Sequence, residues 1–117
     1  MLYTKKINNN KTFTYLYKKG KCIVSRNIVI YVKKNKRPWN GLGISAGKKI
    51  GNAVMRNRAK RVIRQAYYEC EKDMPIGMDM IIVARKNACF VKSTEITAYL
   101  KEKALDMIIK EVFGEEK

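Results

Sequence analysis

Basic side chains recur at helical spacing between residues 48 and 64, and no acidic residue interrupts them. In a helix, Arg56, Lys60 and Arg64 stand four residues apart, and each pair of like charges costs roughly 0.2–0.5 kcal/mol. A solvated helix face, the ordinary interpretation of such a stripe, interleaves Glu with Lys and Arg. The charge also begins in the first turn, where the helix dipole is already positive. The like-charge pairs and the positive first turn destabilise the free helix but become favourable when an anion binds. The pattern therefore predicts a phosphate-binding surface.

The segment before this stripe, Gly47-Lys48-Lys49-Ile50-Gly51, adds two lysines beside the free backbone N–H groups that begin a helix. Helix starts of this kind bind anions. Within the stripe, arginine offers a planar fork for phosphate, and Asn57 can bond a sugar hydroxyl or a base edge. These residue types favour a nucleic acid as ligand. Its affinity should fall with salt, with a log–log slope of roughly −0.7 for each phosphate neutralised on a single strand.

Charge is distributed unevenly along the chain. The first 68 of the 117 residues hold 18 Lys and Arg and no acid, since the first acidic residue is Glu69; the formal net charge is +16 and histidine is absent. Such an excess repels itself unless a polyanion neutralises it, which indicates a nucleic acid or, as the lesser alternative, an anionic membrane. General acid–base or metal-assisted hydrolysis needs His, Asp or Glu gathered at one place. The sequence therefore predicts no catalytic residue and no metal site in the protein.

Composition narrows the class of protein further. The length predicts a single domain, residues 1–117, and the hydrophobic fraction of 46% supplies a core. No apolar run exceeds five residues, which argues against a membrane span and a signal peptide. Cys22, Cys70 and Cys89 fit neither a disulfide framework nor a zinc site, so they are predicted to be buried thiols. We expect a soluble, cytoplasmic protein with no membrane partner.

Hydrophobic spacing predicts the elements of the first half. A short helix follows Asn8-Asn9-Asn10, one of which caps it, and Gly20 ends it; its apolar face holds Phe13, Leu16 and Tyr17. Residues 22–32 are rich in β-branched types and predict a long strand with a bend near Ser25, and residues 33–40 predict a loop. Residues 41–46 alternate, which predicts a half-buried strand whose apolar side is Leu42, Ile44 and Ala46.

Asn52 is the predicted N-cap of a central helix that runs to about Cys70. Its apolar stripe suits packing on a sheet and holds Met55, Ala59, Val62, Ile63, Ala66 and Cys70. Residues 80–84 are uniformly apolar, which predicts a strand covered on both faces beside a parallel neighbour. A last helix starts at Ser93 or Thr94 and buries Ile96, Leu100, Ala104, Met107 and Ile108. The order αβββαβα predicts an α+β fold, a small α/β sandwich with a central sheet.

The stretch from Lys48 to Gln65 contains G-N-A-V-x-R-N-R-x-K-R-x-x-R and closely resembles the protein subunit of bacterial ribonuclease P. The resemblance extends over nearly the whole chain, including Phe13-x-x-x-Tyr17-x-x-Gly20, Gly43-Ile44-Ser45 and residues 79–85. It implies a ribosomal protein S5 domain 2-like sandwich in which the arginine-rich helix forms a left-handed βαβ crossover, against the usual right-handed rule. Two positions depart from the family pattern, since Tyr17 stands where Phe is at least as common and Gly47 replaces a usual Ser.

The resemblance also implies a function. In that family a catalytic RNA, with Mg²⁺, removes the 5′ leader of precursor tRNA, and the protein contributes no catalytic residue. The protein binds the RNA subunit and the leader, and we expect it to bind no cofactor alone and to be monomeric outside the ribonucleoprotein. By position, the RNA-facing set is Lys48, Lys49, Asn52, Arg56, Asn57, Arg58, Lys60, Arg61 and Arg64. The residues expected to line the leader cleft are Phe13, Tyr17, Arg26 and Tyr31.

Other hypotheses stay open at this stage. Composition alone favours a plain RNA-binding structural protein, such as a ribosomal component. An enzyme with its own active site and a DNA-binding helix-turn-helix are weaker, because no nucleophile–base pair is positioned and no partner helix precedes the basic helix. Phe13, taken alone, is more often a core residue than a platform for bases, whereas Tyr17 and Tyr31 tolerate a wet edge.

Overall fold

Helix α1 (Asn10–Lys19) is bounded by the residues that the sequence predicts. The Asn9 side chain accepts a hydrogen bond from the backbone N–H of Lys11 at 2.7 Å, which caps the start of the helix. The Gly20 N–H donates to the Leu16 carbonyl at 2.8 Å and ends it. This computed structural model describes residues 3–114. Among them, no helix combines the length and the hydrophobicity needed to cross a bilayer.

Residues 22–32 form two strands, so the prediction of one bent strand is wrong. Strands β2 (Lys21–Val24) and β3 (Ile28–Lys34) pair antiparallel, with Cys22 opposite Tyr31. Ser25 closes the turn, because its hydroxyl donates to the Ile28 carbonyl at 2.6 Å and its backbone N–H donates to the same oxygen at 3.0 Å. The chain therefore reverses where the sequence predicts only a bend.

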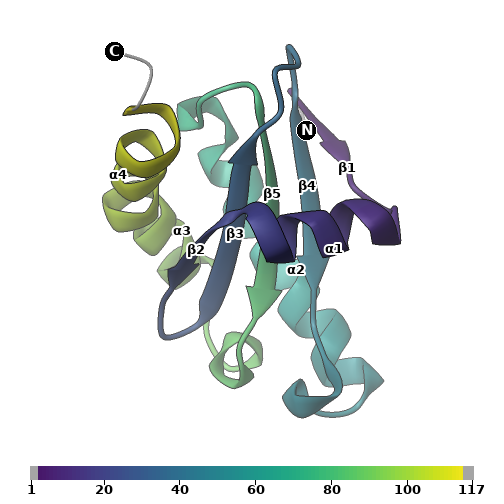
Figure 1. Cartoon of the computed structure of the whole chain (residues 1–117). Coiled ribbons are helices and arrows are strands. Elements are labelled where there is room, and N and C mark those ends of the chain that lie inside the picture. The colour runs from purple at the N-terminus through teal and green to yellow at the C-terminus, as the bar shows by residue number, and fades with distance from the viewer. Residues whose placement is uncertain (1–2, 115–117) are drawn as a thin grey trace.

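Five strands form one sheet in the order β1–β4–β5–β3–β2 (Figure 1). Strand β4 (Asn40–Ser45) runs parallel to β5 (Met78–Ala84), as predicted, but the other neighbour of β5 is the antiparallel β3. Strand β1 (Thr4–Lys6), which the sequence analysis misses, adds a parallel edge beside β4. It is too short to show a period, and its attachment comes from a buried carboxylate far along the chain: Glu71 accepts from the Tyr3 N–H at 3.0 Å and from the Thr4 hydroxyl at 2.6 Å. The observed order is therefore βαβββαβα.

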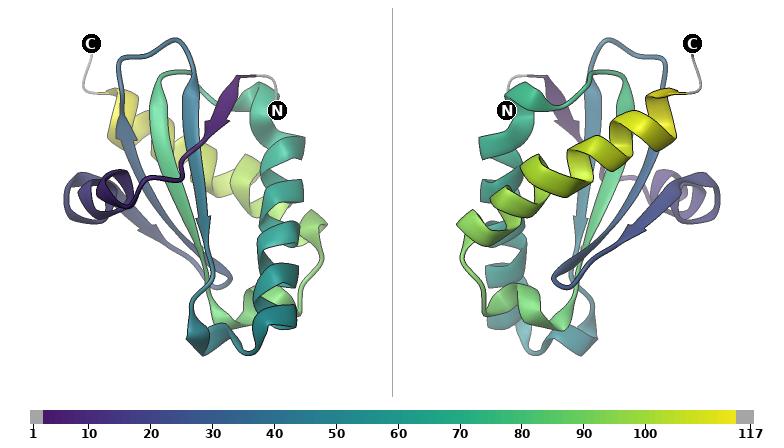
Figure 2. Two further views of the ribbon diagram at one scale, coloured as in Figure 1. Left: turned by 90° about the vertical axis from the view of Figure 1, so that its right-hand side faces the viewer. Right: turned by 90° about the vertical axis from the view of Figure 1, so that its left-hand side faces the viewer.

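The sheet separates two layers of helices. Helix α1 crosses one face, and helix α2 (Ala53–Cys70) lies on the other with the C-terminal helices (Figure 2). In Figure 1, β4 and β5 both run downward, β5 lies to the left of β4, and α2 lies behind the sheet. The β4–α2–β5 crossover is therefore left-handed, against the strong preference for right-handed connections. The main core fills the α2 side of the sheet and includes the fully buried Ile30, Ile63 and Ile82.

The C-terminal helical segment corrects one predicted core residue. It begins as α3 (Ser93–Tyr99), continues through a π-helical turn (Leu100–Ala104) and α4 (Leu105–Ile108), and ends in a second π-helical turn (Ile109–Phe113). Ile96, Leu100, Ala104 and Ile108 are buried, whereas Met107 is 42% exposed. A π turn holds more residues than an α turn, so positions four apart stay aligned on the core. Met107 falls outside that row.

Two of the three cysteines match the prediction. Cys70 and Cys89 are buried, and burial raises the pKa of the Cys70 thiol to about 11. Cys22 is exposed, so its predicted burial is wrong. On β2 its side chain alternates with that of the buried Ile23 and therefore points away from the main core.

Candidate nucleic-acid interface

The start of α2 is shaped by an asparagine and a glycine. The Asn52 side chain accepts a hydrogen bond from the Met55 N–H at 3.0 Å, as predicted for the N-cap. Gly51 has a φ of 141°, which side chains rarely adopt, and a Cβ there would lie 2.6 Å from the Met55 sulfur. Gly51 is therefore favoured by its backbone conformation, and it fixes how the preceding loop enters the helix.

The loop before α2 presents its two lysines to solvent. Lys48 and Lys49 are exposed in a short 3₁₀ turn, whose third residue, Ile50, is buried and anchors the turn to the core. In the part of the chain that the structure describes, no atom lies within 4 Å of the position that a Gly47 Cβ would occupy. The loop thus holds two ammonium groups beside the N-terminus of α2, where free N–H groups favour an anion.

Helix α2 has an apolar face and a basic face, as its sequence predicts. Ala59, Ile63, Ala66 and Cys70 are buried, and Met55 and Val62 pack against them. We call Arg56, Asn57, Lys60, Arg61 and Arg64 the basic band. Its members are exposed or half-buried. Within residues 3–114, Lys21 pairs with Glu111, but no side chain of the basic band forms an ion pair. The band is therefore not neutralised by the protein's own described carboxylates.

The basic band continues onto the sheet through a residue that the sequence analysis misses. Lys6 of β1, with Lys60 and Arg64, lines a groove of about 140 Å³ whose floor is apolar, formed by Ile7, Leu42 and Ile44. Three cations from two elements thus border one groove at the β1–β4 edge. Sequence spacing gives no sign of this, because it depends on β1 pairing with β4.

Tyr68 extends the same surface towards the end of α2. Its ring is 57% exposed and, with Arg61, Arg64 and Gln65, lines a shallow cavity of about 460 Å³. An exposed aromatic ring beside two guanidinium groups combines a surface of the kind on which bases stack with groups of the kind that bind phosphate. The sequence could have indicated Tyr68 as part of this surface, since it lies four residues after Arg64 and seven after Arg61 on one helix face.

Arg58 lies apart from the basic band. Its Nε donates to the Cys89 carbonyl at 2.9 Å, in the short 3₁₀ turn that follows β5 (Lys86–Cys89). The side chain therefore joins α2 to that turn. The structure gives Arg58 a structural contact that the family pattern does not suggest.

Three of the four residues predicted for the leader cleft meet on the other face of the sheet. The Phe13 and Tyr17 ring centroids are 6.3 Å apart with planes at 75°, and those of Tyr17 and Tyr31 are 5.0 Å apart at 85°. We call Phe13, Tyr17 and Tyr31 the ring cluster. Phe13 is half-buried, and a Cβ on Gly43 would lie 2.6 Å from its ring, so the ring rests on bare backbone. Tyr17 remains 41% exposed and provides the open part of the cluster.

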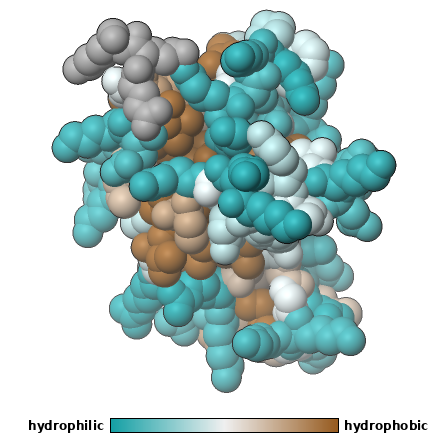
Figure 3. All heavy atoms as spheres, in the orientation of Figure 1, coloured by the Kyte–Doolittle hydropathy of each residue, from teal (hydrophilic) through white to brown (hydrophobic). Residues whose placement is uncertain are grey.

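The sheet continues this surface beyond α1. On β3, Val29 lies on the same face as Tyr31 and is paired with Val83 of β5, and both valines are only half-buried. Figure 3, which views this side, shows apolar side chains below α1 with hydrophilic ones around them. Desolvation raises the pKa of the Tyr31 hydroxyl, and the neighbouring Cys22 and Tyr17 raise it further. This shift favours the neutral hydroxyl, which can donate a hydrogen bond.

Arg26, the fourth predicted cleft residue, does not join the ring cluster. It is exposed in the turn between β2 and β3, beyond the last strand pair, Val24 with Val29. There it lines two small cavities with residues of α3 and of the segment before it, among them Ile96 and Glu95. Sequence spacing could not show this, because the hairpin turn carries Arg26 to the end of the sheet.

Comparisons with known proteins identify the family and the fold of the chain. The family model described as Ribonuclease P matches residues 1–108. A ribonuclease P protein component of Clostridium botulinum (strain Loch Maree / Type A3) is 42% identical over 84 residues, which are 71% of this chain and 76% of that protein. One of Oceanobacillus iheyensis is 44% identical over 81 residues, 68% of this chain and 67% of that protein.

Solved structures show the same fold. The ribonuclease P protein of Staphylococcus aureus superposes with a TM-score of 0.73 at 36% identity, covering 90% of this chain and 94% of that one. That of Thermotoga maritima gives a TM-score of 0.73 at 25% identity, covering 88% of this chain and 94% of that one. Sequence and fold agree over most of the chain. The chain therefore belongs to the bacterial ribonuclease P protein family, the protein component of a ribonuclease that acts in tRNA processing.

Proposed function

We propose that this protein binds the catalytic RNA of ribonuclease P through α2 and binds the 5′ leader of precursor tRNA through the ring cluster. It thereby promotes the Mg²⁺-dependent endonucleolytic removal of the leader, which gives the mature tRNA 5′ end. The observation that carries the proposal is the basic band. Its exposed row of like charges forms no ion pair with the described residues 3–114, and such a row is unfavourable until phosphates bind it.

The RNA subunit would contact the band, the lysine loop and the N-terminus of α2 together. Arginine binds phosphate through a planar fork, lysine acts as a point charge, and asparagine can reach a sugar hydroxyl or base edge. The residues assigned to this contact are Lys48, Lys49, Asn52, Arg56, Asn57, Lys60, Arg61 and Arg64. Arg58 stands at its margin, since its Nε is already bonded to the Cys89 carbonyl.

The leader would stack on the open side of the ring cluster. Stacking of a base on an aromatic ring is worth roughly 1–3 kcal/mol and tolerates every base. Such tolerance suits a leader whose sequence differs between tRNAs. The half-buried Phe13 supports Tyr17, and Tyr17 and Tyr31 present the rings at the surface.

Catalysis is assigned to the RNA rather than to protein side chains. Among residues 3–114, no three His, Cys, Asp or Glu side chains are grouped so that they could hold a metal ion. The proposal assigns the metal to the RNA, whose phosphate oxygens are the hard ligands that Mg²⁺ prefers. The protein's part is to position both RNAs and to neutralise their charge.

Reconstitution tests the proposal. The protein is added to a bacterial ribonuclease P RNA at low Mg²⁺, and leader removal from precursor tRNA is measured beside binding of mature tRNA. We expect restored cleavage and tighter binding of the precursor than of the mature tRNA. Compaction of the RNA with no preference for the precursor would indicate a plain RNA-binding structural protein. Repeatable cleavage by the protein without RNA would place the active site in the protein and overturn the proposal.

A further inference from the structure

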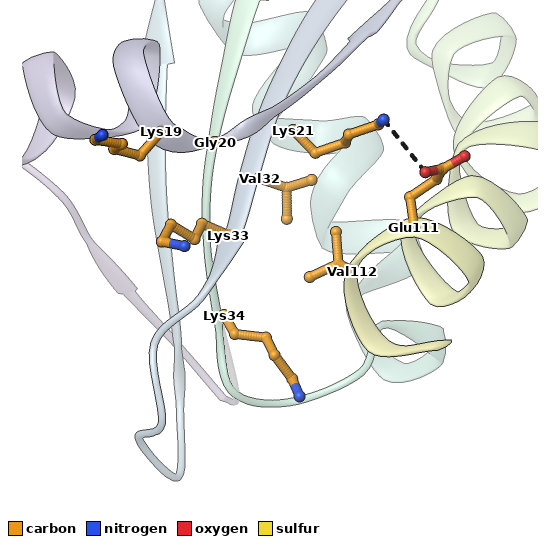
Figure 4. A pocket seen from close by; sticks show the side chains of 8 residues that line it. All are labelled: Lys19, Gly20, Lys21, Val32, Lys33, Lys34, Glu111 and Val112. Carbon is orange, nitrogen blue, oxygen red and sulfur yellow. Dashed lines mark ion pairs between the residues drawn. The ribbon is translucent and has the colours of Figure 1, made fainter. Parts of the chain in front are cut away.

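A second group of lysines lies at the β3–β2 edge of the sheet, opposite the β1–β4 edge where Lys6 and the basic band share a groove. It surrounds a pocket of about 330 Å³ where α1 ends, β2 begins and β3 ends (Figure 4). The C-terminal helical segment forms the remaining wall. The residues that line this lysine pocket are Lys19, Gly20, Lys21, Val32, Lys33, Lys34, Glu111 and Val112.

The charges of the lysine pocket suit an extended polyanion better than one small anion. Among the described residues that line the pocket, four are lysines and one, Glu111, is acidic. In Figure 4 the ammonium groups do not converge: those of Lys19 and Lys33 lie on the α1 side, and those of Lys21 and Lys34 lie on the side of the C-terminal segment. A single phosphate could not reach all of them, whereas successive phosphates of one strand could.

The acid in the pocket is held only weakly. Glu111 pairs with Lys21 at 3.2 Å, but the two side chains are 47% and 51% exposed. An exposed pair of this kind contributes little to stability and is readily replaced. A phosphate can therefore compete with Glu111 for Lys21, so that Glu111 opposes binding in this pocket.

The ring cluster leads directly to the lysine pocket. Lys33 follows Tyr31 by two residues on the same face of β3, about 7 Å further along the strand. Lys19 follows Tyr17 by two residues at the end of α1. A strand that stacks on Tyr17 and Tyr31 and continues along β3 thus reaches Lys33, and Lys19, which points to another side of α1 than Tyr17, borders the same pocket.

The order of the strands gives the path a direction. The groove shared by Lys6 and the basic band lies at the β1–β4 edge, and the lysine pocket lies at the β3–β2 edge. The ring cluster lies between these edges. A strand coming from RNA bound at the first edge therefore crosses the ring cluster before it reaches the lysine pocket.

We infer that the lysine pocket binds the phosphates of the outer leader nucleotides, beyond those stacked on the ring cluster and further from the cleavage site. This inference rests on the proposed function, because it takes the strand on the ring cluster to be the leader. Affinity for precursor tRNA then depends on leader length through Lys19 and Lys33, and Glu111 weakens that dependence.

The test uses the reconstituted holoenzyme and two precursor tRNAs, one whose leader ends at the ring cluster and one with a longer leader. For the long leader, K19A/K33A should raise Kd about tenfold, roughly threefold for each phosphate that is no longer neutralised, and should lower the salt slope by about 1.4. For the short leader Kd should not change. E111Q should tighten binding of the long leader about twofold and leave the short leader unaffected.

Matched variants control for net charge. K101A/K103A removes the same charge from exposed positions on the C-terminal segment, and E102Q makes the same charge change as E111Q. Neither control should change the Kd of the long-leader or the short-leader precursor. Equal losses of K19A/K33A on the two leaders, or no loss on either, would overturn the inference. Failure of the wild-type holoenzyme to prefer short-leader precursor over mature tRNA would instead count against the proposed function, so the two failures are distinguishable.

Discussion

The basic band and the ring cluster are built in different ways. The band lies on one helix, and its residues share a face because of the helical period alone. The ring cluster joins α1 to β3, which pack together only once the sheet has formed. The band therefore depends little on the rest of the fold for its geometry, whereas the ring cluster depends on backbone packing at Gly43. This difference predicts that the two surfaces respond differently to substitution.

The largest effect should come from removing charge from the band. R56A/K60A/R64A should weaken binding to the RNA subunit about 100-fold, because three phosphates are no longer neutralised and the forked contacts of two arginines are stronger than those of a lysine. The log–log salt slope should fall by about 2. The melting temperature should change little, because these side chains face solvent or the groove. Filter binding over a salt series and thermal denaturation measure both. K101A/K103A/K110A is the charge-matched control. Collapse of the fold would show instead that the band is structural.

Removing the rings of Tyr17 and Tyr31 should affect binding of precursor tRNA. Y17A/Y31A should weaken binding of precursor tRNA by about 2 kcal/mol in free energy, or about 30-fold, because the rings on which a leader base stacks are removed. Binding to the RNA subunit should stay the same. Y17F/Y31F retains the rings and should bind nearly as wild type, which separates stacking from hydrogen bonding by the hydroxyls. If the alanine variant weakened binding to both RNAs equally, the division between the two surfaces would be wrong.

Gly43 tests the dependence of the ring cluster on packing. G43A places a Cβ 2.6 Å from the Phe13 ring, so the ring must move, at a cost of roughly 1–3 kcal/mol in the free energy of unfolding. Precursor binding should weaken with it, because Phe13 supports Tyr17. G47A is the control, since no atom of residues 3–114 lies within 4 Å of the Cβ that it would add. Denaturant unfolding and precursor titration measure the two effects, and a neutral G43A would contradict this role of the backbone.

Arg58 and Arg61 test whether the arginines of α2 have different roles, one in stability and the other in RNA binding. R58A removes the hydrogen bond to the Cys89 carbonyl and should lower the free energy of unfolding by about 1 kcal/mol. R61A should leave stability within about 0.5 kcal/mol and weaken RNA binding more than R58A does. The two variants carry the same charge change, so urea denaturation and RNA binding separate the roles. The reverse ranking would place Arg58 in the RNA interface.

The smallest effect concerns the buried face of α2. Burial raises the pKa of the Cys70 thiol from 9.0 to about 11, so the folded state keeps a proton that the unfolded state loses above pH 9. Stability should therefore be unaffected below pH 9 and should fall as pH rises from 9 to 11. C70A should show a shallower fall than wild type in thermal melts over this range. Identical pH profiles for the two proteins would rule out this contribution.

The sequence by itself determined the central helix. The Asn52 cap, the buried stripe around Ala59 and Ile63, and the exposed basic band all follow from a local period and a local capping rule. The end of α1 at Gly20 and the strand beginning near Gly41 follow in the same way. These features involve residues within a few positions of one another, so neighbouring side chains carry the whole signal.

Only the tertiary structure decided which distant segments meet. It turned residues 22–32 into a hairpin that carries Arg26 away from the ring cluster, and it placed Lys6 beside Lys60 by pairing β1 with β4. It also exposed Cys22 and Met107, whose residue types suggest burial. The left-handed crossover of α2 belongs to the same class. Each of these features depends on strand pairing and packing across the whole chain. A local hydrophobic period does not specify them, because a strand or a turn is compatible with several partners until the core forms.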